Sequence, residues 1–255
     1  MCTVVILHRP ESDWPLILAA NRDEMRDRPW RRPGRHWPDR PHVLAGQDTL
    51  AQGSWLGIND DGLVAVILNR EGTLGPAANR RSRGELVLEA LDHADAREAA
   101  DALAHLNPQA WRPFNLLVAD NRDVFWLRHC RDDGSEPVTV HRIPAGLSML
   151  AAHDRNDPAS PRIRVHRPHF AALSPPAPPD QGWEAWAQAL GSAEQDPALA
   201  SEVAPHSAMC FQLPSGFGTV CSSLLALPAA GLGVGPVWRF AAGPPDRTSW
   251  EWVCR

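Results

Sequence analysis

Lysine and tyrosine are absent from this 255-residue chain, so all 25 basic side chains are arginine. Without lysine, Schiff-base catalysis and a lysine general base are excluded. The α-amine at the start of the chain would then be its only primary amine.

Long apolar runs and a basic surplus are also missing. No stretch approaches the roughly 20 apolar residues of a membrane span, and the net charge of −5 argues against general nucleic-acid binding. The start lacks a basic region followed by an apolar signal segment, so we expect a cytoplasmic protein. The five cysteines are odd in number and widely spaced, and the histidines have no diagnostic spacing. We therefore expect no disulfide framework, no metal site and no required cofactor.

The most informative feature that is present is the start, Met1-Cys2. Methionine before a small residue is normally trimmed, which would leave Cys2 with a thiol and a free α-amine. An α-amine has a pKa of about 7.7 to 8.0, so it can accept the proton of the thiol near neutral pH. Cys2 is therefore a candidate N-terminal nucleophile. The alternative is a small, buried and inert strand residue.

A polar cluster, Asn21-Arg22-Asp23-Glu24, follows two apolar runs over residues 2–7 and 16–20. The two runs predict a β-hairpin, with the polar residues placed where the second strand ends. An antiparallel hairpin brings this cluster close to Cys2. Arg22 could then hold a thiolate or an anionic substrate group, and Asp23 or Glu24 could orient the α-amine or Arg22. The alternative is a solvated turn.

A second hairpin is predicted over residues 54–58 and 63–68, around an Asp-Gly turn. It ends at Asn69, which we expect near Cys2 as a donor to a developing oxyanion; a plain turn asparagine is the alternative. The remaining pattern predicts helices over 82–91, 95–106, 162–173 and 183–190, with strands over 114–119, 124–129, 138–143, 147–152, 221–227 and 237–241. Strands, then helices, then strands predict an α+β fold in one domain over residues 1–255.

Residues 22–42 are rich in arginine, tryptophan and proline, which excludes a regular helix or a central strand. Such a segment could cover a pocket, with guanidinium groups gripping carboxylates or phosphates and indoles stacking on a flat ligand. The candidates here are Arg28, Trp30, Arg31 and Arg32. The alternative is an exposed loop in an arginine-rich protein.

Several motifs occur in the order of a known family. They are the Met-Cys start, Asn21-Arg22-Asp23-Glu24, Gly-Ser-Trp-Leu-Gly-Ile at 53–58, Ser-Arg-Gly-Glu-Leu at 82–86, Pro-Phe-Asn-Leu at 113–116 and Gly218-Thr219. In these the chain resembles the NRDE family, also called the Transport and Golgi organisation protein 2 family. The resemblance implies a four-layer αββα sandwich of the N-terminal-nucleophile hydrolase type.

The start also resembles choloylglycine hydrolases, in which a cysteine, an arginine, an aspartate and asparagines form the site. This resemblance implies a catalytic set of Cys2, Arg22, Asp23, Asn69 and Asn115. The candidate substrate-binding residues are Asn21, Glu24, Arg28, Trp30, Arg31, Arg32, Trp55 and Arg83. This chain places its arginine and aspartate consecutively, whereas those enzymes space them.

Two functions of different class follow. The first is a cysteine amidohydrolase that cleaves a linear amide of a small molecule, with Cys2 as nucleophile. The second is a non-catalytic carrier of haem or acyl lipids, since eukaryotic members of the family are associated with haem and lipid handling. Either function implies a small, anionic ligand or substrate, with haem as a candidate ligand.

Overall fold

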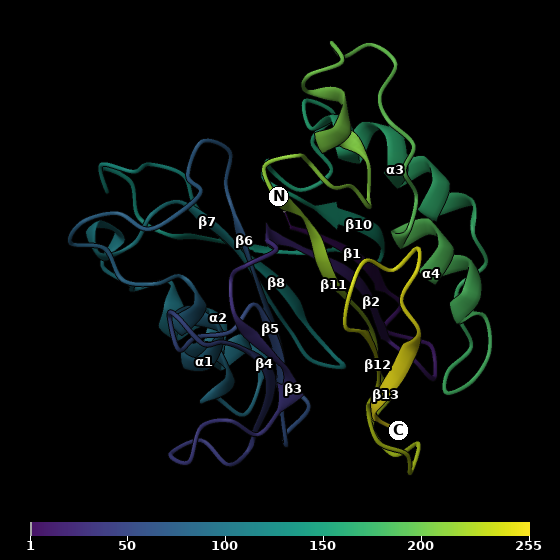
Figure 1. Cartoon of the computed structure of the whole chain (residues 1–255). Coiled ribbons are helices and arrows are strands. Elements are labelled where there is room, and N and C mark those ends of the chain that lie inside the picture. The colour runs from purple at the N-terminus through teal and green to yellow at the C-terminus, as the bar shows by residue number, and fades with distance from the viewer. Residues whose placement is uncertain (1) are drawn as a thin grey trace. The chain divides into compact units, whose positions relative to one another are not determined.

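The computed structural model describes residues 2–255, which fall into two compact units. The first unit combines residues 2–28 with residues 145–255, so it is built from both ends of the chain, whereas the second is the continuous stretch 29–144. Figure 1 shows this division by colour, with purple strands beside green and yellow ones in the first unit. The expectation of a single domain over residues 1–255 stays a prediction.

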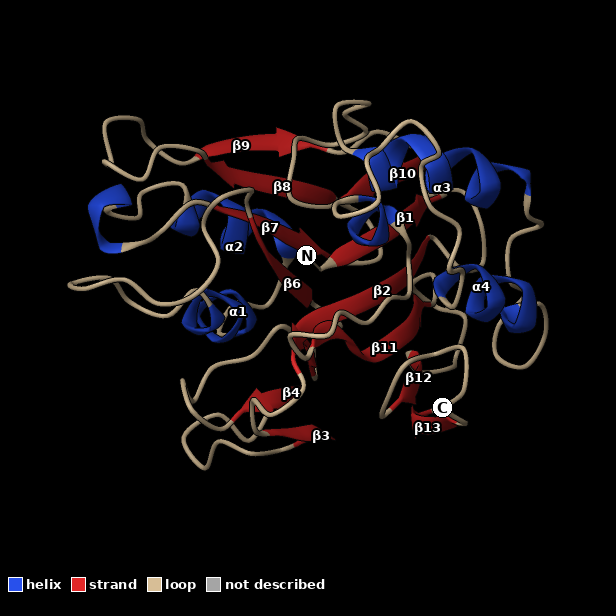
Figure 2. Ribbon diagram, turned by 45° about the horizontal axis from the view of Figure 1, so that its top comes forward, coloured by secondary structure: helices blue, strands red, loops and turns tan. Residues whose placement is uncertain are grey.

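In the first unit, six strands form an antiparallel sheet in the order β10-β1-β2-β11-β12-β13. The helices α3 and α4 lie against this sheet, α3 on β10 and α4 on β2 and β11 (Figures 1 and 2). The elements are β1 (Thr3–His8), β2 (Leu16–Met25), β10 (Gly146–Leu150), α3 (Pro161–Ala172), α4 (Trp183–Leu190), the 3₁₀ helix η2 (Ala204–Ser207), β11 (Phe217–Leu227), β12 (Val237–Ala241) and β13 (Trp250–Cys254).

The predicted first hairpin is present, with Thr3 paired to Asn21 and His8 to Leu16. Side chains alternate between the two faces of a strand, and the odd-numbered apolar residues of β1 and β2 pack with α3 and α4. This alternation places Asn21 and Asp23 on the helix-covered face of the sheet. Arg22 and Glu24 lie on the opposite face.

The second strand ends in the polar segment, as predicted, but this segment is not a solvated turn. β2 continues to Met25, and its polar residues pair in the ladder with β11, Arg22 opposite Cys221 and Asp23 opposite Thr219. Asn21, Arg22 and Asp23 are all buried. A polar stretch can extend a buried strand when other elements supply its hydrogen-bond partners, which apolar periodicity does not reveal.

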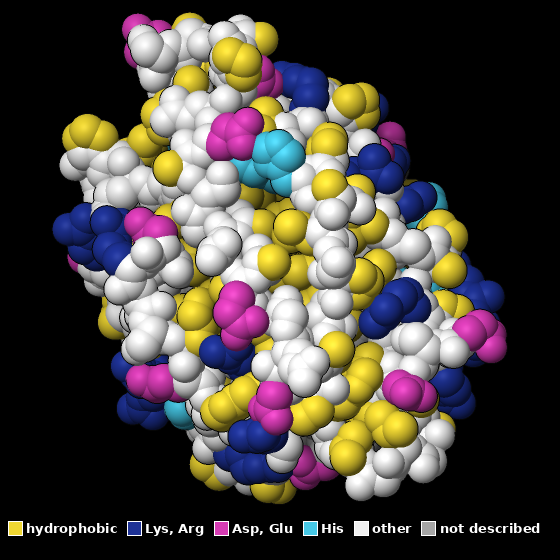
Figure 3. All heavy atoms as spheres, turned by 90° about the vertical axis from the view of Figure 1, so that its right-hand side faces the viewer, with side chains coloured by type: hydrophobic (Ala, Val, Ile, Leu, Met, Phe, Trp, Pro, Cys, Tyr) yellow, Lys and Arg dark blue, Asp and Glu magenta, His cyan; other side chains and the backbone are white. Residues whose placement is uncertain are grey.

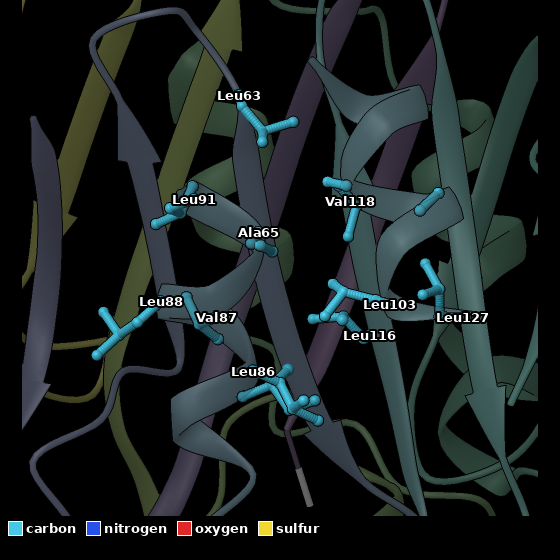
Figure 4. Close-up of a cluster of buried hydrophobic side chains, with 14 of the residues drawn as sticks. Leu63, Ala65, Leu86, Val87, Leu88, Leu91, Leu103, Leu116, Val118 and Leu127 are labelled. Atoms are coloured by element: carbon cyan, nitrogen blue, oxygen red, sulfur yellow. The ribbon is translucent and has the colours of Figure 1, made fainter. Parts of the chain in front are cut away.

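In the second unit, seven strands form an antiparallel sheet in the order β3-β4-β5-β6-β7-β8-β9. The elements are β3 (Trp30–Gly34), β4 (Val43–Asp48), β5 (Leu56–Asn59), β6 (Val64–Asn69), α1 (Gly84–Leu91), α2 (Ala96–Leu103), the 3₁₀ helix η1 (Pro108–Ala110), β7 (Phe114–Ala119), β8 (Val124–His129) and β9 (Thr139–Arg142). Leucine, valine and alanine side chains of α1 and α2 pack on β6, β7 and β8 to form its core (Figure 4).

The arginine-rich segment 22–42 contains the short edge strand β3. The pairing of β3 with β4 shifts register between Arg31 and Gly34, around Pro33. Because proline lacks an N–H, an edge position with an interrupted ladder accommodates it. The exclusion of a central strand is therefore confirmed for residues 30–34, whereas it is wrong for residues 22–25, which belong to β2 between β1 and β11.

Within residues 2–255, no helix is long and apolar enough to cross a membrane. The same residues contain no group of three or more His, Cys, Asp or Glu side chains placed to hold a metal ion. On the side that carries α3 and α4, basic and acidic side chains are interspersed (Figure 3).

Candidate functional site

The amino-terminal hairpin brings Cys2 next to Asp23, as the sequence predicted. The Cys2 Sγ lies 3.7 Å from the backbone oxygen of Asp23 and donates a weak hydrogen bond to it. Cys2 directly precedes β1, and its neighbour Thr3 pairs with Asn21 across the ladder. A partly buried thiol thus lies at the end of the sheet where β2 carries its polar residues.

The Asp23 carboxylate is held from two sides. Its Oδ2 accepts a hydrogen bond from Arg162 Nη1 at 2.7 Å, and its Oδ1 accepts one from Thr219 Oγ1 at 2.8 Å. Burial opposes ionisation of this carboxyl, but nearby cations, Arg162 among them, hold the pKa of Asp23 below its ordinary value. Asp23 is therefore a fixed carboxylate beside the candidate nucleophile.

The charge state of Cys2 follows from these surroundings. Burial raises the pKa of the Cys2 thiol, the negative charge of Asp23 raises it further, and Arg22 acts in the opposite direction with a smaller effect. Near neutral pH the resting thiol keeps its proton. A reaction at this sulfur needs a base to remove that proton.

Arg22 begins a short chain of charges on the face of β2 that the helices do not cover. Its Nη2 is 3.9 Å from Glu24 Oε2, and the same oxygen is 3.6 Å from Arg28 Nε. Arg22 is 5% exposed, whereas Glu24 and Arg28 are each more than a quarter exposed. The chain therefore leads from the buried neighbourhood of Cys2 to the surface.

The Asn21 side chain makes hydrogen bonds to other residues of the first unit. Its Nδ2 donates to the backbone oxygens of Leu190 at 3.0 Å and Met209 at 2.9 Å, while its Oδ1 accepts from Ser222 Oγ at 2.6 Å. These bonds fasten β2 to the end of α4, to β11 and to the segment that follows η2. A substrate-binding role for Asn21 stays a prediction.

The candidate asparagines Asn69 and Asn115 belong to the second unit, and their participation in a site with Cys2 stays a prediction. Asn69 ends β6 and pairs with Phe114. Asn115 is buried in β7, where its Oδ1 accepts hydrogen bonds from Arg70 Nη1 at 2.7 Å and Trp126 Nε1 at 3.0 Å.

The other candidates in the second unit line its loops and edge. Arg83 Nη1 donates to Thr73 Oγ1 and to the backbone oxygen of Pro113, each at 3.0 Å, so it braces the loop before α1. The Trp30 ring meets the Trp55 ring edge to face, with centroids 5.7 Å apart. The two remaining candidates in this unit, Arg31 and Arg32, are exposed.

Sequence reasoning did not single out Arg162, Thr219 or Ser222 as site residues, although each contacts the polar segment of β2. Arg162 was expected only as the start of a helix. Thr219 was noted within the Gly218-Thr219 motif without a role. The sequence does not show which polar residues contact a buried aspartate, because these contacts depend on how distant segments pack in three dimensions.

Comparison with solved structures identifies the class of fold. The chain is similar to an N-acylethanolamine-hydrolysing acid amidase orthologue of Caenorhabditis elegans, with a TM-score of 0.56, 13% identity, and coverage of 88% of this chain and 92% of that one. It is also similar to penicillin V acylase of Agrobacterium tumefaciens, with a TM-score of 0.51, 12% identity, and coverage of 99% and 86%. A mutant conjugated bile acid hydrolase of Clostridium perfringens gives a TM-score of 0.51 at 10% identity, with coverage of 100% and 97%.

These likenesses confirm the predicted fold class, an α+β fold of the N-terminal-nucleophile hydrolase type.

Sequence comparison then gives the family. The profile of the family Transport and Golgi organisation 2 matches residues 1–231. A human Transport and Golgi organization protein 2 homolog is 32% identical over 91% of this chain and 90% of its own length. The bovine homolog is 36% identical over 58% of this chain and 56% of its own length. The chain belongs to this family.

Proposed function

We propose that this protein is a cysteine amidohydrolase that cleaves a linear amide of a small molecule, with Cys2 as the amino-terminal residue of the working enzyme. The observation that carries the proposal is the position of the Cys2 thiol, 3.7 Å from the backbone of Asp23 and beside an ionised carboxylate. The fold is also that of amidases and acylases.

The chemistry proceeds in two steps. The Cys2 sulfur attacks the amide carbonyl carbon, and its α-amine takes the thiol proton and passes it to the departing nitrogen. The C–N bond breaks and a thioester forms. Water then attacks the thioester, the α-amine takes a proton from this water and returns it to sulfur, and the carboxylic acid leaves.

The surroundings of Cys2 suit this division of labour. Because the pKa of the thiol is raised, the sulfur needs a local base, and an α-amine with a pKa of about 7.7 to 8.0 is matched to that task. In this proposal the Asp23 carboxylate orients the α-amine, and Arg22 stabilises negative charge near the sulfur.

The test is a screen of N-acyl amides with protein whose intact mass shows Cys2 as the first residue. We expect turnover that is lost in Cys2→Ala and retained in Cys130→Ala, which removes a partly buried cysteine of the second unit. The absence of turnover across the panel by wild-type protein, or turnover indifferent to Cys2, would overturn the proposal.

The lack of lysine gives a second, independent test. Amine-directed acetylation of protein that begins at Cys2 should modify one site, the α-amine. Because the acetylated nitrogen can no longer accept a proton, we expect hydrolysis to stop although the thiol is intact. Full activity after complete acetylation would refute the role of the α-amine.

The alternative is a carrier of haem or acyl lipids. It is favoured by the exposed Arg31 and Arg32 next to the Trp30–Trp55 ring pair on and near β3, a set suited to an anionic, flat or apolar ligand. Titration with haemin and with an acyl-CoA should show binding weakened by Arg31→Ala with Arg32→Ala. The exposed Arg26 supplies the matched control, Arg26→Ala. Tight binding without hydrolysis would favour the carrier.

A further inference from the structure

We propose that Arg162, the second residue of α3, is the positioning residue that fixes Asp23 for the reaction at Cys2. This inference rests on the proposed hydrolase function. It assigns a role in the site to a residue that lies 160 positions after Cys2, on a helix of the layer that covers the sheet.

The first observation is the way in which Arg162 joins the residues around Cys2. Its Nη1 donates to Asp23 Oδ2 at 2.7 Å and to Thr3 Oγ1 at 2.8 Å. Thr3 is the neighbour of Cys2 in the chain, so one guanidinium nitrogen connects the carboxylate to the strand that carries the nucleophile.

The second observation is that Arg162 is itself fixed from its other side. Its Nη2 donates to the backbone oxygen of His206 at 3.0 Å, and its guanidinium lies 5.3 Å from the centre of the Phe211 ring. The side chain is 4% exposed, and the Asp23 side chain is fully buried. A planar fork with several fixed donors can hold a carboxylate in one orientation, which a single ammonium cannot do.

Thr219 completes the arrangement from the opposite side. Its Oγ1 donates to Asp23 Oδ1 at 2.8 Å, so each carboxylate oxygen has a donor from a different element, α3 for one and β11 for the other. Asp23 cannot rotate without breaking one of these bonds. The orientation of the Asp23 carboxylate is therefore set by Arg162 and Thr219.

The charges facing Asp23 determine how the loss of Arg162 is detected. Among the described residues, Arg162 on α3 supplies a cation that faces Asp23, and the titratable groups that interact with Asp23 are Cys2, His206, Cys210 and Cys221. Arg22, on the opposite face of β2, acts on Cys2. Without the Arg162 cation the buried Asp23 ionises less readily. At higher pH, where Cys2 titrates, Asp23 is ionised and its charge raises the pKa of Cys2 with less compensation.

The experiment compares wild type, Arg162→Met, Arg162→Lys and Thr219→Val. The matched control is Arg164→Met, because Arg164 lies on the same helix and pairs with another buried aspartate, Asp196, with Nε 2.9 Å from Oδ2. Each variant is first checked for folding by circular dichroism. The readouts are kcat and KM on the amide found in the screen, the pH profile of kcat/KM, and the pH dependence of Cys2 alkylation by iodoacetamide.

We expect kcat to fall about 100-fold in Arg162→Met with little change in KM, because misplacement of a group at the reacting centre has effects of that size. The acid limb of kcat/KM and the midpoint of Cys2 alkylation should both move to higher pH. Arg162→Lys should bring both pH values back toward wild type while kcat stays low, since it restores charge without the fork. Thr219→Val should lower kcat with a smaller shift, and Arg164→Met should leave all readouts unchanged.

Three results would overturn the inference: an unchanged pH profile and alkylation midpoint in folded Arg162→Met, full recovery of kcat in Arg162→Lys, or equal effects in Arg164→Met. Failure of the proposed function is seen separately, because wild type then hydrolyses no amide. Alkylation of Cys2 needs no substrate and still tests the link between Arg162 and the thiol.

Discussion

Replacement of Asn21 by alanine is the stability test that the structure defines most sharply. Asn21 is 2% exposed and makes three hydrogen bonds, to the backbone oxygens of Leu190 and Met209 and to Ser222 Oγ. Thr219 Oγ1 lies 3.3 Å from the Met209 oxygen, but its single proton goes to Asp23 Oδ1. In Asn21→Ala the Leu190 oxygen, the Met209 oxygen and the Ser222 hydroxyl therefore all lose the Asn21 side chain as their partner.

Each buried polar group left without a partner costs about 1–3 kcal/mol, so with three such groups we expect Asn21→Ala to lower the free energy of unfolding by about 3–9 kcal/mol. Ser222→Ala deprives only Asn21 Oδ1 of its donor and should cost about 1–3 kcal/mol by the same reasoning. Asn21→Asp keeps the shape but replaces the Nδ2 donor by an oxygen facing two carbonyl oxygens. It should destabilise the fold at least as much as Ser222→Ala.

The assay is urea denaturation followed by circular dichroism, with the slope of the transition compared between variants. Gln188→Ala, an exposed change on α4, is the control and should stay within about 0.5 kcal/mol of wild type. If Asn21→Ala also stayed within that range, Asn21 would not fasten β2 to α4, and the explanation for a polar residue in the middle of this sheet would be wrong.

Three further outcomes are expected. Burial lowers the pKa of His166 to about 4, so between that pH and about 6.5 the unfolded chain binds a proton at this residue and the folded chain does not. Acidification across this window should therefore lower the free energy of unfolding by as much as about 3 kcal/mol. The variant His166→Phe should flatten this pH dependence in urea titrations at several pH values. A Cβ at Gly46 would lie 2.3 Å from the Trp55 ring, so Gly46→Ala should cost about 1–3 kcal/mol by overpacking, whereas Gly235→Ala, with nothing within 4 Å, should be near neutral in the same assay. The midpoint of Cys2 alkylation by iodoacetamide should lie above that of a free cysteine, because burial and Asp23 raise the pKa of the thiol; a midpoint below it would contradict the description of its surroundings.

The elements that carry a strong apolar period were predictable from sequence. The hairpins over β1–β2 and β5–β6, the strand pair β7–β8 and the helix α4 all appear within a few residues of their expected bounds. Their burial is decided by local alternation or by a helical stripe, which the sequence displays directly. The resemblance to the family supplied the fold class, which periodicity alone does not reach.

The burial of Asn21 and Asp23 within β2 could not be predicted, because it depends on partners far away in the chain. Asn21 needs Leu190, Met209 and Ser222, and Asp23 needs Arg162 and Thr219. The dependence on distant partners also explains why only part of the candidate site could be predicted. Cys2, Arg22 and Asp23 could be grouped through a hairpin, whereas Arg162 enters through the packing of α3 on the sheet.

The assembly of the first unit from both ends of the chain also sets the order of events during synthesis. Thr219 follows Asp23 by 196 residues, a delay of about 10–40 s at ribosomal rates of about 5–20 residues per second. Throughout that interval β2 has only β1 beside it, since the strand on its other side, β11, has not been completed. The amino terminus is therefore open to processing enzymes on the nascent chain, and the surroundings of Cys2 form only after those enzymes have had access to it.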